Sequence, residues 1–356
     1  MARLGVPVTV AASRAGDICQ DYLAGHGIEV CVLEQQDYSP SWVGCKVANW
    51  LHFYNLAWKY IGQLPDSTLL WIGSADTALA LSSRLLKRRY VLQLHELYDD
   101  FLLYKWGLRP FARNARCIVT PERNRAAIVQ YWYRLDTAPV VLPNKPTKHG
   151  RCMLTDAPAL AALQHLDPHS KIVLYQGYIR AERDIRSVAS VVSELGDRWR
   201  FVVMGKDEGF LRHIRAVCPN VVYIPAIEAP LHLQVTTRAF VGVITYTKTS
   251  LNHLFCAPNK VWEYAGAGVP MLCDDLPGLR CVADAGAGAQ ADFLDRHAVR
   301  SCLLRMEREY DRYRSAALRM FDSVDIDGIL RQVLIQCGFT SDTARLAGQA
   351  RYDEAP

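Results

Sequence analysis

Short apolar runs alternate with longer stretches of helical spacing along most of this chain. In the first half the apolar runs fall at 8–12, 28–33, 69–72, 90–94, 117–120 and 140–142, and in the second half at 172–175, 201–204, 221–223, 241–245 and 271–273. Helical spacing stands out at 75–86 and at 121–132, where Thr120 is predicted to cap a helix that starts at Pro121. Strands that alternate with helices predict parallel sheets with crossover helices, an α/β fold.

The alternation stops at the Pro-Asn-Lys-Pro segment 143–146, is followed by a polar stretch to about residue 169, and then starts again. A length of 356 residues favours two domains. We therefore predict two Rossmann-like domains, 1–145 and 146–322, and a closing helix with tail at 323–356. Ligands of such sheets bind beyond the carboxyl ends of the strands, so the loops at those ends are expected to hold the site.

The composition argues against several classes of protein. Half of the residues are hydrophobic and 22% are charged, which argues against a disordered chain. No apolar run approaches the ~20 residues of a membrane span, and the first residues do not resemble a signal peptide, so a cytoplasmic location is expected. The eleven cysteines are scattered without metal-ligand spacing, so neither a disulfide framework nor a metal site is predicted.

The net charge of +5 is unevenly distributed. One segment has Glu122 as its only acid among six arginines: Arg109, Arg113, Arg116, Arg123, Arg125 and Arg134. One interpretation is a solvated helix face, and the other is a surface that attracts anionic lipid headgroups or a phosphorylated acceptor. No aromatic-basic module for nucleic acid is visible, so nucleic acid is not an expected partner.

The segment 257–270 carries the clearest chemistry. Pro258 predicts a helix start, which places Asn259 and Lys260 in the first turn, where free backbone N–H groups attract an anion. Glu263 follows about one turn later on the same face as Lys260. A helix N-terminus, a cation and a carboxylate in this order could hold a diphosphate and the hydroxyls of a ribose, which indicates a nucleotide-sugar site.

This block resembles the C-terminal domain of GT-B glycosyltransferases. It comprises Ser250-Leu251-Asn252, Pro258-Asn259-Lys260, Glu263-Tyr264, Gly268-Val269-Pro270 and Asp274-Asp275-Leu276-Pro277-Gly278. It is most similar to the retaining glycosyltransferase family four, or group one, in the Pro-Asn-Lys-x-x-Glu-Tyr variant that is common in bacterial surface-polysaccharide enzymes. The resemblance spans roughly residues 90–280. It implies two Rossmann-like domains that face one another across a cleft, with the last helix returning to the N-terminal domain.

The resemblance also implies an activity. A sugar would pass from a nucleotide-diphosphate donor to a hydroxyl acceptor, with retention and without a metal or other cofactor, in surface-polysaccharide or glycolipid synthesis. Whether the acceptor is lipid-linked, and whether the protein contacts the inner face of an anionic membrane peripherally, is left open. The donor sugar, its base, the acceptor, the linkage and the oligomeric state are not determined by the sequence.

The resemblance assigns roles to individual residues. Arg183 and Lys260 would stabilise the leaving diphosphate, Glu263 would orient the ribose, and His95 would touch the transferred sugar. Nucleotide contacts are expected at Gly177, Arg183, Lys206, Asn259, Lys260 and Glu263. Alternatively, Arg183 and Lys206 are solvated surface residues, and His95 is a loop histidine that caps the next helix.

The sequence departs from the family pattern at two positions. Tyr178 stands where a basic residue is usual, with Arg180 as a substitute, and Phe255 stands where the first glutamate of the Glu-x7-Glu pattern is expected. Asn252, His253 or backbone near Cys256 would then contact the sugar. These departures keep open a catalytically inactive GT-B subunit that only binds a partner. A nucleotide-sugar epimerase or phosphorylase of the same fold is the other alternative.

Overall fold

The computed structural model describes residues 1–13, 17–33, 43–146, 161 and 163–339, with only the backbone at 17–19 and 43–47. The chain divides into two compact units. Unit 1 comprises Met1–Leu142 and Ile326–Pro356, and unit 2 comprises Pro143–Asp325. In the described ranges no helix is both long and apolar enough to cross a bilayer.

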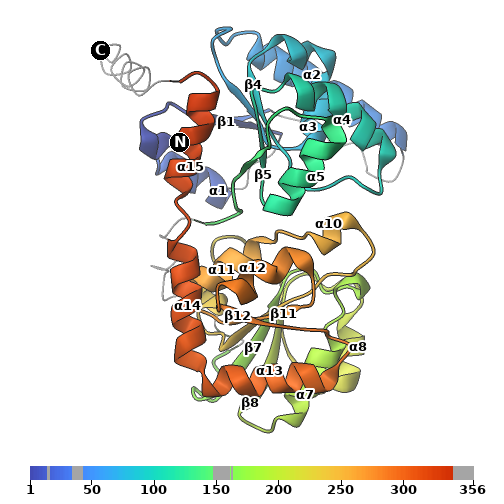
Figure 1. Cartoon of the computed structure of the whole chain (residues 1–356), viewed down its shortest axis with the longest axis vertical. Helices are drawn as coiled ribbons and strands as arrows, with labels where there is room; N and C mark the ends of the chain where they lie inside the picture. Colours follow the sequence, from blue (N-terminus) through green and yellow to red (C-terminus); the bar gives the residue numbers. More distant parts are fainter. Residues whose placement is uncertain (14–16, 34–42, 147–160, 162, 340–356) are drawn as a thin grey trace. The chain divides into compact units, whose positions relative to one another are not determined.

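Unit 1 contains two parallel sheets, β1-β2 and β3-β4-β5-β6 (Figure 1). Its strands are β1 (Thr9–Ala12), β2 (Glu29–Val32), β3 (Leu70–Ile72), β4 (Tyr90–Gln93), β5 (Cys117–Thr120) and β6 (Val140–Val141). Its helices are η1 (Ala2–Leu4), α1 (Asp17–Ala24), α2 (Val43–Ile61), α3 (Ala75–Leu81), η2 (Ser82–Lys87), α4 (Leu102–Asn114), α5 (Arg123–Tyr133) and α15 (Ile326–Gln336).

Helix α15 belongs to unit 1 although it follows unit 2 in the sequence (Figure 1). Val333, on this helix, packs with Val91, Val119 and Val140 of strands β4, β5 and β6. Because these side chains are apolar and buried, their removal from water stabilises this attachment.

Unit 2 is built on one parallel sheet of six strands in the order β12-β11-β10-β7-β8-β9. The strands are β7 (Lys171–Gln176), β8 (Trp199–Met204), β9 (Val222–Ile224), β10 (Val241–Ile244), β11 (Met271–Asp274) and β12 (Gly288–Ala291). The helices are η4 (Ala181–Arg183), α7 (Arg186–Glu194), α8 (Leu211–Val217), α9 (Leu233–Thr236), α10 (Leu251–Leu254), α11 (Asn259–Ala267), η5 (Pro277–Leu279), α12 (Arg280–Asp284), α13 (Arg296–Arg308) and α14 (Tyr310–Asp322). This is a doubly wound order that reverses between β7 and β10, the point where such sheets open to a ligand.

Helices cover both faces of this sheet (Figure 1). Val173 and Tyr175 of β7 point into a core with α7, α8 and α13, whereas Leu174 points into a second core with α11 and α14. Successive strand residues face opposite sides, so β7 is apolar at nearly every position rather than at every second one.

The structure corrects three local predictions. Strand β12 was missed because its sequence, Gly288-Ala-Gln-Ala, lacks large apolar side chains; a Cβ at Gly288 would lie 2.0 Å from the carbonyl oxygen of Met271, so the close approach there requires glycine. Helix α5 starts at Arg123 instead of Pro121, because the Glu122 carboxylate accepts from the N–H groups of Asn124 and Arg125. The single helix predicted at 75–86 is α3 followed by the 3₁₀ turn η2.

Candidate functional site

The site lies at the switch point of the unit 2 sheet. Gly177 follows β7 and Gly205 follows β8, with φ of +132° and +149° that favour glycine. A Cβ on Gly205 would lie 1.8 Å from the carbonyl oxygen of Gly177, so the two loops meet backbone against backbone. This arrangement leaves the end of β7 without a side chain at position 177, next to the start of α11.

No side chain of the described residues caps the N-terminus of helix α11. Pro258 is its N-cap residue without a side-chain hydrogen bond, and its first turn holds no acidic residue. Asn259 is exposed, whereas Lys260 is 9% exposed and its Nζ lies 4.5 Å from the ring centroid of Tyr175. The Lys260 ammonium also lies beside Gly177, 3.2 Å from where a Cβ of that residue would be. The structure thus brings Gly177, Asn259 and Lys260, three of the predicted residues, together at the N-terminus of α11.

The Lys260 ammonium is held in an unfavourable environment. Burial, followed by repulsion from Arg183, lowers its pKa from the ordinary 10.5 to about 7, and the charge of Glu263 offsets only part of this. Burial also raises the pKa of Tyr175 to about 12, so the phenol beside Lys260 stays neutral. In the described part of the chain Lys260 has no hydrogen-bond or ion-pair partner. An anion bound here would relieve this cost.

Arg183 provides the second cation. It ends the short 3₁₀ helix η4, and its guanidinium carbon lies 3.3 Å from the ring centroid of Tyr246. Its Nη1 donates to the carbonyl oxygen of Thr245 at 3.5 Å. The Lys260 ammonium lies 5.9 Å from the same Tyr246 ring, so both cations approach the loop that follows β10. Two neighbouring cations of this kind form a site for a multiply charged anion such as a diphosphate.

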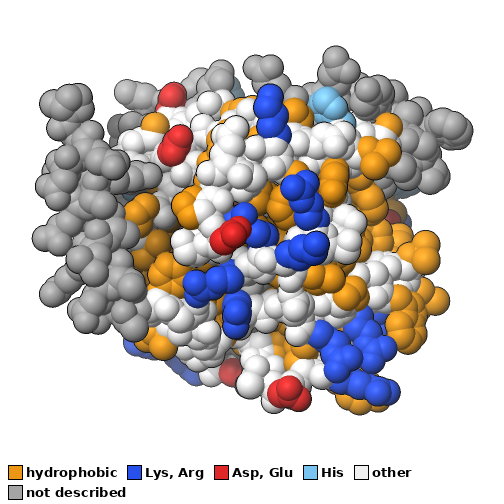
Figure 2. Space-filling view, turned by 90° about the horizontal axis from the view of Figure 1, so that it is seen from above, with side chains coloured by type: hydrophobic (Ala, Val, Ile, Leu, Met, Phe, Trp, Pro, Cys, Tyr) orange, Lys and Arg blue, Asp and Glu red, His pale blue; other side chains and the backbone are white. Residues whose placement is uncertain are grey.

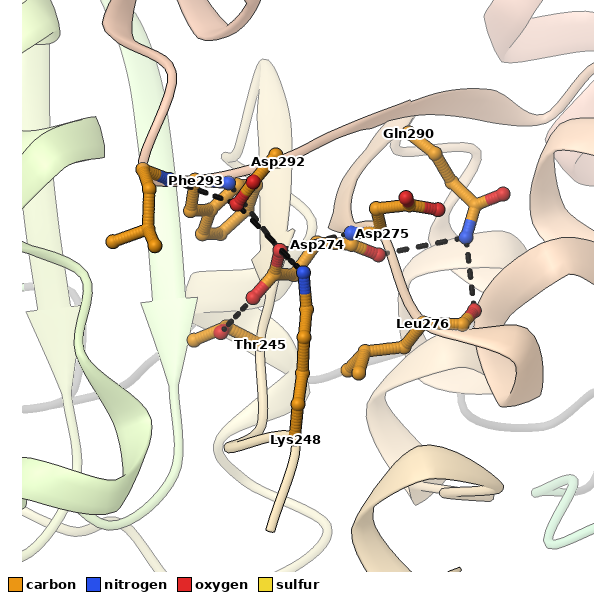
Figure 3. A network of polar contacts seen from close by, with 9 residues as sticks. Thr245, Lys248, Asp274, Asp275, Leu276, Gln290, Asp292 and Phe293 are labelled. Atoms are coloured by element: carbon orange, nitrogen blue, oxygen red, sulfur yellow. Dashed lines mark hydrogen bonds and ion pairs between the residues drawn. The ribbon is translucent and has the colours of Figure 1, made fainter.

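A polar network fixes the start of that loop (Figure 3). The Thr245 hydroxyl donates to buried Asp274 at 2.9 Å, and Asp274 also accepts from the backbone of Asp275 and Phe293. Lys248 lies 3.8 Å from Asp274 and 3.7 Å from Asp292 (Figure 3). The ends of β10, β11 and β12 are thereby joined, which positions Tyr246 and through it Arg183.

Two side chains of unit 2 contact the Glu263 carboxylate. Gln176 Nε2 donates to Oε2, and His232 Nε2 lies 3.3 Å from Oε1. The Thr236 hydroxyl in turn donates to Gln176 Oε1 at 2.9 Å. Because a carboxylate that is only 15% exposed needs partners, this network holds Glu263 at the helix start before any ligand binds.

Two other predicted residues make contacts outside the cluster formed by Gly177, Arg183, Asn259, Lys260 and Glu263. Lys206 is exposed, and its carbonyl oxygen accepts from Ile179 N. Arg180, the substitute for a basic residue at Tyr178, lies 2.8 Å from Glu182 and 3.9 Å from Glu208.

His95 follows β4 in unit 1, and its carbonyl oxygen accepts from Nη1 of buried Arg125. Arg125 is therefore part of the interior. One interpretation of the arginine segment, a solvated helix face, does not apply to this residue. Among the described residues, no three His, Cys, Asp or Glu side chains gather as metal ligands would.

Sequence reasoning missed three residues of the cluster. Gln176 offered a signal, because it is a polar residue at the end of a buried apolar strand. His232 and Tyr246 offered none, because they come from loops without a recognisable motif and reach the site only through the tertiary fold.

No protein-family model and no curated protein matches the chain by sequence. Solved structures do match it. HepE from Anabaena in complex with UDP and glucose is 13% identical, with a TM-score of 0.67 over 93% of this chain and 92% of that one. Sucrose-phosphate synthase from Thermosynechococcus elongatus is 14% identical, with a TM-score of 0.66 over 99% and 98%. A glycosyltransferase from Rickettsia africae is 10% identical, with a TM-score of 0.65 over 94% and 90%. These similarities confirm the predicted GT-B fold of two Rossmann-like domains.

Proposed function

We propose that this protein is a retaining glycosyltransferase that moves a sugar from a nucleotide-diphosphate sugar to a hydroxyl acceptor. The observation that carries the proposal is the meeting of Lys260 and Arg183 at the uncapped start of α11, with Glu263 one turn further on. A buried cation without a counter-ion, as Lys260 is, is costly, and a diphosphate supplies the charge that it lacks.

Each residue of the cluster has a role in this reaction. Lys260 and Arg183 neutralise the charge that builds on the leaving diphosphate, which lowers the barrier to breaking the glycosidic bond. Glu263 accepts from the ribose hydroxyls. The backbone at Gly177 and Asn259 approaches the phosphates, Lys206 contacts the nucleotide from the next loop, and His95 touches the transferred sugar. The proposal includes no metal, since the two cations carry its electrostatic role.

Structural similarity supports a uridine nucleotide as the first donor to test, because HepE is solved with UDP and with UDP-glucose. The cluster offers no placed nucleophile for a double displacement, so we propose attack from the face of the leaving group. We assign binding of the acceptor to residues 1–145 and binding of the nucleotide sugar to residues 146–322. The segment 323–356 is proposed to pack back on the N-terminal domain. The proposed setting is cytoplasmic synthesis of surface polysaccharide or glycolipid, where a lipid-linked acceptor would bring the enzyme to the inner face of the membrane.

Release of nucleoside diphosphate tests the proposal. Nucleotide sugars are first screened by thermal shift, since a ligand stabilises the fold by mass action. The best donor is then incubated with an acceptor extract. We expect Arg183→Ala to lower the rate by about 100-fold, as loss of one charged contact to a transition state does.

Arg186→Ala is the matched control, because Arg186 is a neighbouring arginine that pairs with Asp184 at the surface and lies outside the cluster. It should keep the wild-type rate. Equal background rates for wild type and Arg183→Ala would instead support the subunit that binds without catalysis.

The pKa of Lys260 predicts a pH-dependent affinity for the donor. A bound diphosphate raises this pKa above its value of about 7 in the free protein, so binding is tightest below about pH 7 and requires proton uptake above it. Affinity for UDP-glucose should therefore fall by up to about tenfold per pH unit above 7. Calorimetric titrations over this range measure the slope. Lys260→Arg should remove it, because a guanidinium stays protonated; a flat profile for the wild type would contradict the prediction.

A further inference from the structure

Four aromatic side chains meet at one place in unit 1, with Tyr104 at their centre. The Tyr104 ring centroid lies 5.0 Å from that of Tyr98, and the two rings are stacked with an interplanar angle of 19°. The rings of Phe101 and Trp50 lie 6.2 Å and 6.3 Å from Tyr104 in edge-on arrangements. Phe101 is 63% exposed, and the other three residues are half-buried. We call these four residues the aromatic cluster.

The aromatic cluster comes from segments that follow the carboxyl ends of strands. Trp50 lies in α2, which follows β2, and two of the rings lie in the loop between β4 and α4. Asp76, in the first turn of α3 after β3, accepts from the Tyr104 hydroxyl at 2.5 Å. Because β3 and β4 are parallel neighbours, the segments that follow them leave the sheet at the same edge. His95 lies in the loop after β4 too, so the cluster shares this edge with the proposed sugar contact.

Carboxylates accompany the aromatic cluster. Asp76 contacts it directly, and two more aspartates follow Tyr98 in the sequence. Burial, together with the charges of Asp76 and Glu96, raises the pKa of Tyr98 to about 12, so this phenol stays neutral. Arg125 pairs with Glu96 and offsets one of these charges. The remaining negative charge would repel an anionic ligand.

Other parts of unit 1 have the opposite charge. Figure 2, a view onto unit 1, shows basic side chains beside exposed hydrophobic ones and few acidic side chains. Of the described residues that line a hollow of about 240 Å³ in this unit, three are arginines, Arg113, Arg116 and Arg134, and one is acidic, Asp136. A phosphorylated ligand is attracted to arginines of this kind and not to the carboxylates beside the aromatic cluster. Charge therefore favours a neutral ligand at the cluster.

We propose that the aromatic cluster binds the acceptor as a neutral sugar. The faces of a pyranose ring present C–H groups, which suit the negative face of an aromatic ring, whereas its hydroxyls point outward and donate to a carboxylate. Phe101 supplies an exposed ring, and Asp76 supplies the carboxylate. The inference rests on the proposed function and names the class of its acceptor, a hydroxyl on a saccharide that carries no phosphate.

Saturation-transfer NMR tests the proposal without donor or turnover. The full chain is mixed with methyl β-D-glucopyranoside, methyl β-D-galactopyranoside or methyl α-D-mannopyranoside, each with and without a 6-phosphate. We expect saturation of the ring C–H protons of at least one neutral glycoside and weaker binding of its 6-phosphate. Phe101→Ala should raise the dissociation constant of that glycoside about tenfold, because it removes the exposed ring. Asp76→Asn should raise it about fivefold, because an amide oxygen accepts more weakly than a carboxylate.

Tyr131→Ala and Asp66→Asn are the matched controls. Tyr131 is 83% exposed, Asp66 forms a surface ion pair with Arg88, and both lie outside the aromatic cluster, so these variants should bind as the wild type does. Unfolding temperatures establish that each variant is folded. The proposal is overturned if no glycoside receives saturation, if the 6-phosphates bind at least as tightly, or if Phe101→Ala and Asp76→Asn bind like the controls.

Calorimetry with UDP keeps this outcome separate from that of the proposed function. Binding of a glycoside without binding of UDP would contradict the glycosyltransferase and leave the sugar site. Binding of UDP by the wild type, together with unchanged glycoside binding in Phe101→Ala and Asp76→Asn, would contradict only the role of the aromatic cluster.

Discussion

Replacing Lys260 with methionine is expected to abolish sugar transfer and to make the protein more stable. Transfer should fall by about 1,000-fold, because the variant loses the charge that we propose stabilises the leaving diphosphate. The unfolding free energy should rise by about 2–4 kcal/mol, because burial and Arg183 hold the pKa of Lys260 far below its ordinary value, which is a cost to the folded state. Methionine has a similar volume and no charge to bury.

The stability gain should depend on pH in a defined direction. Between about pH 7 and 10.5 the unfolded chain binds a proton at Lys260 that the folded protein has lost, so wild-type stability rises with pH in this window. The advantage of Lys260→Met is therefore largest below about pH 7 and shrinks as the pH rises. Denaturant titrations at several pH values measure it.

Lys87→Met is the control, since Lys87 is exposed, and it should change stability little at any pH. A Lys260→Met protein that is less stable than the wild type would show that the lysine contributes to the fold rather than waiting for an anion.

Replacing Glu263 with alanine is expected to weaken binding of UDP by about 100-fold. The variant would lose the two charge-assisted hydrogen bonds that we propose Glu263 makes with the ribose hydroxyls. It also leaves Gln176 Nε2 and His232 Nε2 without their acceptor, so the network at the start of α11 loosens. Calorimetry with UDP measures the loss, and Glu194→Ala, at a surface ion pair with Arg296, is the control.

A nucleotide without the ribose hydroxyls distinguishes a lost ribose contact from a loosened network around Glu263. The wild type should bind 2′,3′-dideoxy-UDP about 100-fold more weakly than UDP, whereas Glu263→Ala should bind the two alike, since the interaction is already absent. If Glu263→Ala still preferred UDP by the full factor, another group would hold the ribose, and Glu263 would have only a structural role.

The sequence by itself was enough to predict most strands and the helix that carries Lys260 and Glu263. Apolar runs predicted eleven strands, β1 to β11, because a buried parallel strand is apolar at nearly every position, and this signal is complete within a few residues. Pro258, Asn259, Lys260 and Glu263 could likewise be placed on one helix, because capping and the spacing along a turn are local properties. Strand β12 escaped because glycine and alanine fit a tightly packed edge without an apolar signal.

Only the tertiary structure decided which groups meet. Glu263 is held by Gln176 and His232, and Arg183 stacks on Tyr246, although each pair is separated by at least 31 positions in the sequence. The strand order joins β7 to β10 at the centre of the sheet, and this switch brings their loops to the start of α11. A local pattern holds no information on that order, because it is chosen by the burial of two whole sheet faces. The lowered pKa of Lys260 follows from the same packing, and so could not be predicted from its neighbours along the chain.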